Sequence, residues 1–323
     1  MAGEGRVDEG AFYGEWAGHR PGDLAGVLRG CCGEGGGEGR RRRVLWLLGD
    51  SSLDNKFWLR FCPPPRRAQP CNGYERALRP GHLMHRDVCY WLNRAALRAP
   101  GLDLVTINAA VEASTLGERS GSCGGPRLLP QDLFAAAHML PGDVLCVSVG
   151  GNDVAMRPTM LTTLAMLTLS RASPDSVTSG RAWGLRYLVR LFRDGLRTYL
   201  GHVLGDCPVA AVLVCCVYYP SLGGGGTSWA DPALRVLGYD HDPTRLQSVL
   251  REIFERAVSD VRVPGIPVVP VPLFEFLDPG CPADYVARVE PSVVGGRKLA
   301  EGILAQLRPL LPMPTTTTAA CGE

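Results

Sequence analysis

The sequence lacks several features that would assign it to a common class. It has no apolar run of the roughly 20 residues that a membrane span needs, and the best run, Met160 to Leu169, is about half that length. Its net charge is only +2, which argues against nucleic acid as the main partner. Met1 to Glu15 has no apolar signal core, so we expect a cytoplasmic protein. No spacing of its six histidines and its cysteines resembles a zinc site, and we expect no metal or cofactor.

Cysteine, in contrast, is plentiful, with 12 residues. In a chain that is not exported these thiols are expected to stay reduced. Cys146, Cys215 and Cys216 lie in apolar runs that are typical of a core. Cys62 and Cys71 bracket a proline-rich loop, and a disulfide between them is an alternative that the sequence leaves open.

The composition predicts one substantial domain with irregular ends, because 46% of the residues are hydrophobic and 20% are charged. Residues 1–42 are rich in glycine and end in arginines, so we expect a flexible lead, with Asp8 to Trp16 as a possible docked piece. Residues 43–311 should form the domain. Residues 312–323, which include four consecutive threonines, are expected to be a disordered tail.

Within this domain, short apolar runs alternate with helical patterns, which predicts an α/β fold. Such alternation is typical of a parallel sheet covered by helices on both sides, with the active site at the carboxyl ends of the strands. The predicted strands are Val44–Leu48, Leu102–Asn108, Asp143–Val149, Val209–Tyr218 and Ile266–Val271. The predicted helices are His82–Leu97, Gln131–His138, Arg181–Leu204, Pro243–Ser259 and Gly296–Leu307.

The loop after the first predicted strand contains Gly49-Asp50-Ser51. A serine directly after a buried strand has its hydroxyl above the sheet edge and its amide in the cleft. It can therefore attack a carbonyl and donate to the resulting oxyanion. The alternative is that Asp50 or Ser51 only caps the next turn.

The loops after the next two strands carry further polar residues. Residues 108–115 read NAAVEAST, and Gly150-Gly151-Asn152-Asp153 follows the third strand. Together with Gly49-Asp50-Ser51, these segments resemble the first three sequence blocks of the GDSL/SGNH hydrolases. The resemblance covers roughly Val44 to Leu307. It implies a flavodoxin-like, three-layer α/β/α fold with a five-stranded parallel sheet, and an esterase, lipase, thioesterase or deacetylase activity.

The resemblance also implies roles for three residues. Ser51 is the nucleophile, and its amide is one oxyanion donor. Ala113 occupies the position of a family glycine whose amide is the second donor. The side chain of Asn152 is the third, although a loop-bracing asparagine is the alternative. We also assign Asp50 and Gly151, which flank these groups, to the substrate site.

The last block departs from the family. There, an Asp-x-x-His-Pro motif precedes the final helix, with a glycine four residues after the proline. Here Pro291 and Gly295 are present, but Glu290 stands at the histidine position and Ala287 at the aspartate position. An ordinary glutamate, with a pKa near 4.3, is a weak base toward serine. Burial can raise that pKa and recover part of the loss.

Another histidine is the remaining alternative for the base. His85 lies at the start of the helix predicted after the serine loop, and His241 lies in the loop after the fourth strand. For both, a solvated or capping role is the competing interpretation.

Two long insertions, residues 57–79 and 218–239, follow strands at the active-site edge. Such loops commonly form substrate walls. Trp58, Tyr74 and Trp229 within them are candidates for an apolar pocket, or else pack the loops onto the domain.

The sequence therefore predicts hydrolysis of a small-molecule ester or thioester through a Ser51 acyl-enzyme, with Glu290 as the base. The alternative is an inactive relative that retains the pocket to bind an acyl or carbohydrate ligand. The oligomeric state is not predicted.

Overall fold

The computed structural model describes residues 5–33, 41–99, 101–121, 127–223 and 228–311. Its centre is a five-stranded parallel sheet with strand order β4-β1-β5-β6-β7. Numbered along the chain, this is the order 2-1-3-4-5 of flavodoxin-like folds. The strands are β1 (Arg43–Gly49), β4 (Leu104–Asn108), β5 (Val144–Ser148), β6 (Ala211–Cys216) and β7 (Val268–Pro272). The predicted fold class is confirmed.

The strands form where the sequence is rich in aliphatic residues. Val44 to Leu48 of β1 are fully buried because helices cover both faces of the sheet. Four further two-residue strands make two small hairpins, β2 (Arg67–Ala68) with β3 (Met84–His85) and β8 (Tyr285–Val286) with β9 (Glu290–Pro291).

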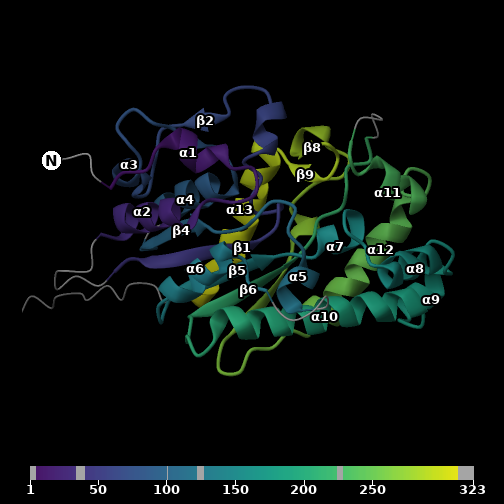
Figure 1. The fold of residues 1–323 in the computed structure, drawn as a ribbon. Coiled ribbons are helices and arrows are strands. Elements are labelled where there is room, and N and C mark those ends of the chain that lie inside the picture. Colours follow the sequence, from purple (N-terminus) through teal and green to yellow (C-terminus); the bar gives the residue numbers. More distant parts are fainter. Residues whose placement is uncertain (1–4, 34–40, 100, 122–126, 224–227, 312–323) are drawn as a thin grey trace, which may run out of the picture.

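Helices complete the three layers. Figure 1 shows α4 and α13 above the sheet and α6 and α10 below it. The longer helices are α2 (Pro21–Cys32), α4 (Val88–Arg98), α6 (Pro130–His138), α8 (Met160–Leu169), α10 (Trp183–Leu204), α12 (Pro243–Ile253) and α13 (Val293–Leu307). The shorter ones are α1 (Glu9–Gly14), α3 (Tyr74–Ala77), α5 (Leu116–Ser120), α7 (Gly151–Ala155), α9 (Pro174–Thr178) and α11 (Asp231–Val236).

Two helix starts differ from the prediction by three residues or more. The helix expected from His82 begins at Val88, because the Asp87 side chain accepts a hydrogen bond from the Tyr90 amide and caps it there. The last helix begins at Val293 rather than Gly296, because the Ser292 hydroxyl accepts from the amides of the first turn.

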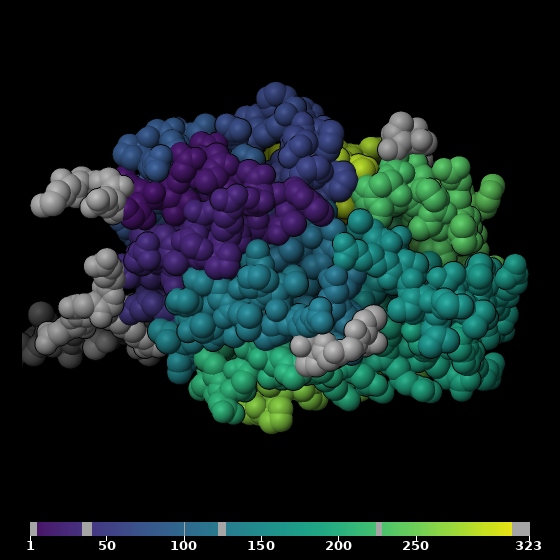
Figure 2. Space-filling model, in the orientation of Figure 1, coloured from purple at the N-terminus to yellow at the C-terminus, as the bar shows by residue number. Residues whose placement is uncertain are grey.

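The N-terminal segment is a larger correction. We predicted a flexible lead over residues 1–42 with Asp8 to Trp16 as a docked piece. α1 lies within that piece, but α2, over residues 21–32, was not predicted. Phe12, Leu24 and Val27 are buried in the same core as the sheet. Figure 2 shows this purple segment packed over the body of the molecule. The prediction of a disordered tail over residues 312–323 falls outside the described residues.

Two other observations bear on predictions from the sequence. The ten cysteines in the described ranges, Cys62 and Cys71 included, are free thiols. Among the helices that the structure describes, none combines the length and the apolar character needed to cross a membrane.

Candidate active site

The serine loop starts with a turn that only glycine allows. Gly49 ends β1 with φ +127°, and a Cβ there would lie 1.8 Å from the Ser148 carbonyl oxygen. The next amide, of Asp50, donates to that same oxygen at 2.9 Å. The chain therefore bends sharply into Ser51, which is 9% exposed and lines a cavity.

Asp50 braces this loop. Its carboxylate accepts hydrogen bonds from the Ser52 amide at 3.1 Å and the Ser52 hydroxyl at 2.6 Å. Burial raises the pKa of Asp50 to about 6. This is the capping role that the sequence left open for Asp50, and Asp50 also lines the cavity.

The second loop sits against the end of β1. The Val111 amide donates to the Gly49 carbonyl at 2.9 Å, and the Ser114 hydroxyl donates to it at 3.0 Å. Between these anchors, Ala113 has φ +57° and is 5% exposed. This left-handed conformation costs a residue with a Cβ about 1–2 kcal/mol, which explains why glycine suits the position.

Two backbone amides in the serine loop and the second loop have no hydrogen-bond acceptor among the described residues. Among the described residues, neither the Ser51 amide nor the Ala113 amide donates a hydrogen bond. Nearly all buried amides in proteins are paired, so unpaired ones call for an explanation. Two adjacent loops that each leave an amide unpaired can supply donors to a ligand oxygen.

Asn152 is held beside these amides by α7. Gly150 precedes it with φ +120°, where a Cβ would lie 2.3 Å from the Phe192 ring. One hydrogen of the Asn152 side-chain amide is donated to the Ser114 carbonyl at 2.9 Å, which leaves the other available. The Asp153 carboxylate accepts from the Leu116 amide at 2.7 Å and so ties α7 to the second loop.

Glu290 reaches the site on the β8–β9 hairpin. The turn has two consecutive residues in the left-handed region, Ala287 (φ +49°) and Arg288 (φ +68°). The Arg288 guanidinium donates to Asp231 at 2.9 Å and to Asp240 at 2.8 Å, which fastens the turn to the α11 insertion. Strain of this kind persists only where surrounding contacts enforce it.

The Glu290 carboxyl is 1% exposed and lines the same cavity as Ser51. Burial, and next the nearby Glu112 carboxyl, raise the pKa of Glu290 well above its ordinary value. The Ser51 hydroxyl and the Trp229 indole face the carboxyl and partly offset this increase in pKa. Its Oε2 atom has no hydrogen-bond partner among the described residues, and the same holds for Trp229 Nε1. The carboxyl is therefore buried and available.

Neither neighbouring arginine neutralises Glu290. Arg288 pairs with the two aspartates named above, and Arg297 faces Glu301 at 3.9 Å. Asn55 connects the hairpin to the serine loop, because its side-chain amide donates to the Pro291 carbonyl at 3.0 Å.

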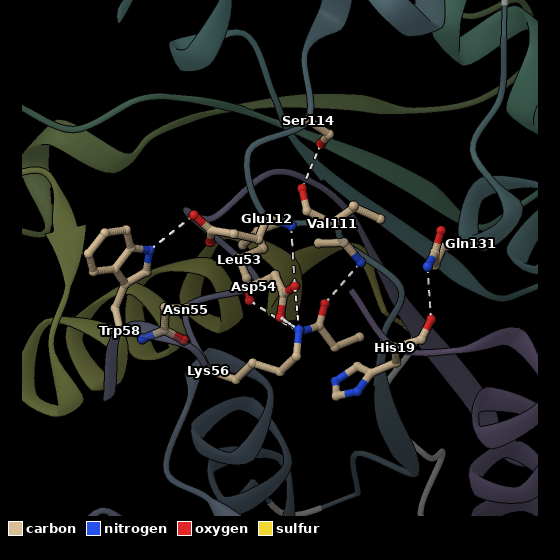
Figure 3. A network of polar contacts seen from close by, with 12 residues as sticks. His19, Leu53, Asp54, Asn55, Lys56, Trp58, Val111, Glu112, Ser114 and Gln131 are labelled. Carbon is tan, nitrogen blue, oxygen red and sulfur yellow. Dashed lines mark hydrogen bonds and ion pairs between the residues drawn. The ribbon is translucent and has the colours of Figure 1, made fainter. Parts of the chain in front are cut away.

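Behind the serine loop lies a buried network of charged groups (Figure 3). Lys56 Nζ contacts the two Asp54 carboxylate oxygens at 2.7 and 2.6 Å. Asp54 also accepts from the Glu112 amide at 3.3 Å, and Trp58 Nε1 donates to the Glu112 carboxyl at 3.0 Å. Burial, followed by Asp54, raises the pKa of Glu112 to about 8.

A second buried ion pair was missed from the sequence. Arg119 donates to Asp132 at 2.9 Å and to the Gly49 carbonyl at 3.1 Å, and both side chains are fully buried. Tyr199 donates to the same aspartate at 2.7 Å. This network holds the end of β1 through the Gly49 carbonyl. Its side chains come from three separate helices and form no sequence motif, so the sequence did not predict it.

The cavity at Ser51 has a volume of about 160 Å³. The residues that line it include Ser51, Gly151, Asn152, Trp229 and Glu290. Its walls come mainly from α8, α11 and α12, on the right of Figure 1, and from α10, which runs along the lower edge of the view.

The other predicted pocket residues lie elsewhere. The prediction for Tyr74 is wrong, because its ring is buried in the core and its hydroxyl donates to the Thr106 carbonyl at 3.1 Å. Trp58 contacts Glu112 and does not line this cavity.

All six histidines fall within the described residues, and none lines the cavity. His85 stacks on Tyr13 with ring centroids 4.0 Å apart, and burial lowers its pKa to about 4. His241 is exposed. His19 stacks on Phe12 and is hydrogen-bonded to its carbonyl. The alternative in which His85 or His241 acts as base has no support from their positions.

Comparisons with known proteins find similarity among solved structures only. No family model and no curated protein sequence matches it. Among solved structures, it is similar to the lipase Lip_vut3 from a goat rumen metagenome, with a TM-score of 0.45 and 14% identity over 82% of this chain and 97% of that one. It is also similar to a lipase/acylhydrolase from Enterococcus faecalis, with a TM-score of 0.43 and 14% identity over 84% of this chain and 98% of that one. A third similar structure is a variant of an acetyl xylan esterase from Geobacillus stearothermophilus, with a TM-score of 0.40 and 16% identity over 82% of this chain and 94% of that one.

Proposed function

We propose that this chain is a serine ester hydrolase that acts on a small-molecule ester or thioester through a Ser51 acyl-enzyme. The observation that carries the proposal is that Ser51, the Asn152 side chain and the buried Glu290 carboxyl line one cavity. The backbone amides of Ser51 and Ala113, on two adjacent loops, donate no hydrogen bond among the described residues.

The chemistry assigns one task to each group. Ionised Glu290 takes the proton of the Ser51 hydroxyl while the oxygen attacks the carbonyl carbon. The amides of Ser51 and Ala113 and the amide side chain of Asn152 donate to the developing oxyanion. The intermediate then collapses, the carbon–oxygen or carbon–sulfur bond to the leaving group breaks, and Glu290 returns the proton to it. Water then attacks the acyl-enzyme while Glu290 takes the proton of the water. The bond to Ser51 breaks, Glu290 returns the proton to the Ser51 oxygen, and the acid is released.

The raised pKa of Glu290 has two consequences for this mechanism. A base with a pKa nearer to neutrality is better matched to a serine hydroxyl than an ordinary glutamate. The same increase in pKa keeps the carboxyl protonated at low pH, so the active form accumulates as the pH rises.

A second candidate function is ligand binding without turnover. The raised pKa of Glu290 favours it, because a carboxyl that keeps its proton cannot accept the proton of the serine. In that case the cavity would hold its ligand beside Ser51 and Glu290, and no covalent intermediate would form.

Active-site labelling tests the proposal. The purified protein is incubated with a fluorophosphonate probe beside Ser51→Ala, Glu290→Gln and Glu301→Gln, the last being an exposed glutamate on α13 that serves as a matched control. We expect labelling of Ser51 in the parent and the control, none in Ser51→Ala, and labelling slowed about 10²-fold or more in Glu290→Gln. Absence of labelling across pH 6 to 9 would contradict the hydrolase and favour the binding protein.

A further inference from the structure

The lining of the cavity at Ser51 is mostly apolar. Apart from the groups assigned to catalysis, its walls are mainly aliphatic and aromatic side chains from four helices. They include Leu169 of α8, Phe192 of α10, Leu234 of α11, and Leu246, Val249 and Ile253 of α12.

The polar residues in these walls are already paired. The Ser170 hydroxyl donates to the Leu167 carbonyl at 2.9 Å, and the Tyr218 hydroxyl donates to the Val289 carbonyl at 2.7 Å. The Arg245 guanidinium is hydrogen-bonded to the Ser170 carbonyl. A sugar in this space would lose its hydrogen bonds to water without replacing them, which is costly. An alkyl chain makes no hydrogen bonds to water, so it loses none when it enters the cavity.

The volume limits the length of that chain. At about 160 Å³, the cavity matches engineered apolar cavities of about 150 Å³ that bind benzene, a six-carbon molecule. An acetyl group would leave most of the space unfilled, and a chain of sixteen carbons would exceed it.

We infer that the cavity is a medium-chain acyl site that selects esters or thioesters of acids with about six carbons. This inference rests on the proposed function. The acyl part is the better occupant than the alcohol, because the acyl group stays bonded to Ser51 while the alcohol must leave before water enters. The acyl chain extends from Ser51 between α8, α10, α11 and α12.

Two isomeric esters separate acyl from alcohol recognition. Methyl hexanoate and pentyl acetate have the same atoms, but only the first has a six-carbon acyl group. Each buried methylene is worth about fourfold, so the four additional acyl methylenes should raise kcat/KM about 10²-fold for methyl hexanoate. Equal rates, or faster hydrolysis of pentyl acetate, would overturn the inference.

Substitutions at the wall locate the effect. Ala233→Phe on α11 fills the cavity and should reduce the preference for methyl hexanoate at least tenfold. Val236→Phe on the same helix is the control, because Val236 is 61% exposed and does not line the cavity. Leu246→Ala enlarges the cavity and should move the preferred acyl length upward by two or three carbons, about the number of carbons that it removes. A preference that neither wall substitution changes would contradict the assignment.

A binding measurement separates this inference from the hydrolase itself. Titration calorimetry with hexanamide and acetamide on Ser51→Ala needs no turnover. We expect hexanamide to bind at least tenfold more tightly than acetamide, and Ala233→Phe to abolish the difference. If hexanamide binds in this way but no ester is hydrolysed, the acyl site stands and the hydrolase fails. If esters are hydrolysed without a chain-length preference, the hydrolase stands and the acyl site fails.

Discussion

Replacing Lys56 by methionine removes the cation of the buried pair behind the serine loop while keeping a side chain of similar length. The two side chains are 1% and 0% exposed, so water cannot replace the lost ammonium group. Asp54 would retain only long hydrogen bonds, from Asn108 Nδ2 at 3.4 Å and the Glu112 amide at 3.3 Å. Removing one partner of a buried pair typically costs about 3–5 kcal/mol, and we expect a loss of that size in the free energy of unfolding.

The loss should depend on pH in a defined direction. Burial already raises the pKa of Asp54, and Lys56 is the main group that lowers it. Without Lys56 the pKa of Asp54 rises further, so the folded state holds its proton more tightly than the unfolded state. The deficit is then largest at alkaline pH and shrinks as the pH falls through the folded-state pKa.

Urea unfolding followed by circular dichroism at pH 5.5 and 8.0 measures both effects. The double variant Asp54→Asn/Lys56→Met removes both charges and should recover to within about 1–2 kcal/mol of the parent. Arg297→Met, whose exposed pair with Glu301 is 3.9 Å long, is the control and should cost less than about 0.5 kcal/mol. A cost below about 1 kcal/mol for Lys56→Met, or a double variant as unstable as the single one, would refute the reasoning.

Three further predictions follow from single positions. Ala113→Gly relieves a left-handed residue and should raise the free energy of unfolding by about 0.5–1 kcal/mol, with the fluorophosphonate labelling rate changed less than twofold; a destabilised variant would contradict the strain. Glu112→Gln removes a carboxyl whose raised pKa, about 8, makes the fold less stable as the pH rises from 4.5 to 8. Over this pH range, urea titrations should show the free energy of unfolding of Glu112→Gln falling on the order of 1–4 kcal/mol less than that of the parent. An equal fall in both proteins would contradict the prediction. Gly49→Ala places a Cβ against the Ser148 carbonyl and should cost about 3 kcal/mol or more and abolish labelling, whereas a stable, labelled variant would show that the turn tolerates a side chain.

The sheet and the loops that carry Ser51 and Asn152 were predictable because their signals are local. Buried parallel strands such as residues 44–48 are continuous aliphatic runs, and a polar loop follows each of them at one edge of the sheet. Glu290 was found as the residue at a motif position. The burial of Glu290 could not be predicted, because it depends on Asn55, Tyr218 and the α11 insertion, which are distant from Glu290 in sequence.

Other features lacked a local signal. The apolar faces of α8 and α12 line a cavity, but their spacing is the same as that of residues packed into a core. The glycine-rich sequence around α2 predicted flexibility, because intrinsic helix propensity is low there. Leu24 and Val27 instead gain their stability from burial against the domain.

The pH dependence of ester hydrolysis tests the central claim, that Glu290 acts as the base for Ser51. The measurement is kcat/KM for p-nitrophenyl acetate and p-nitrophenyl hexanoate from pH 5 to 9, in the parent, Ser51→Ala and Glu290→Gln. We predict a rate that rises with pH as Glu290 ionises. In Glu290→Gln the rate should fall about 10²–10⁴-fold and no longer rise with pH, and Ser51→Ala should show only the background rate. A Glu290→Gln variant that keeps the parent's rates and the parent's pH profile would contradict it.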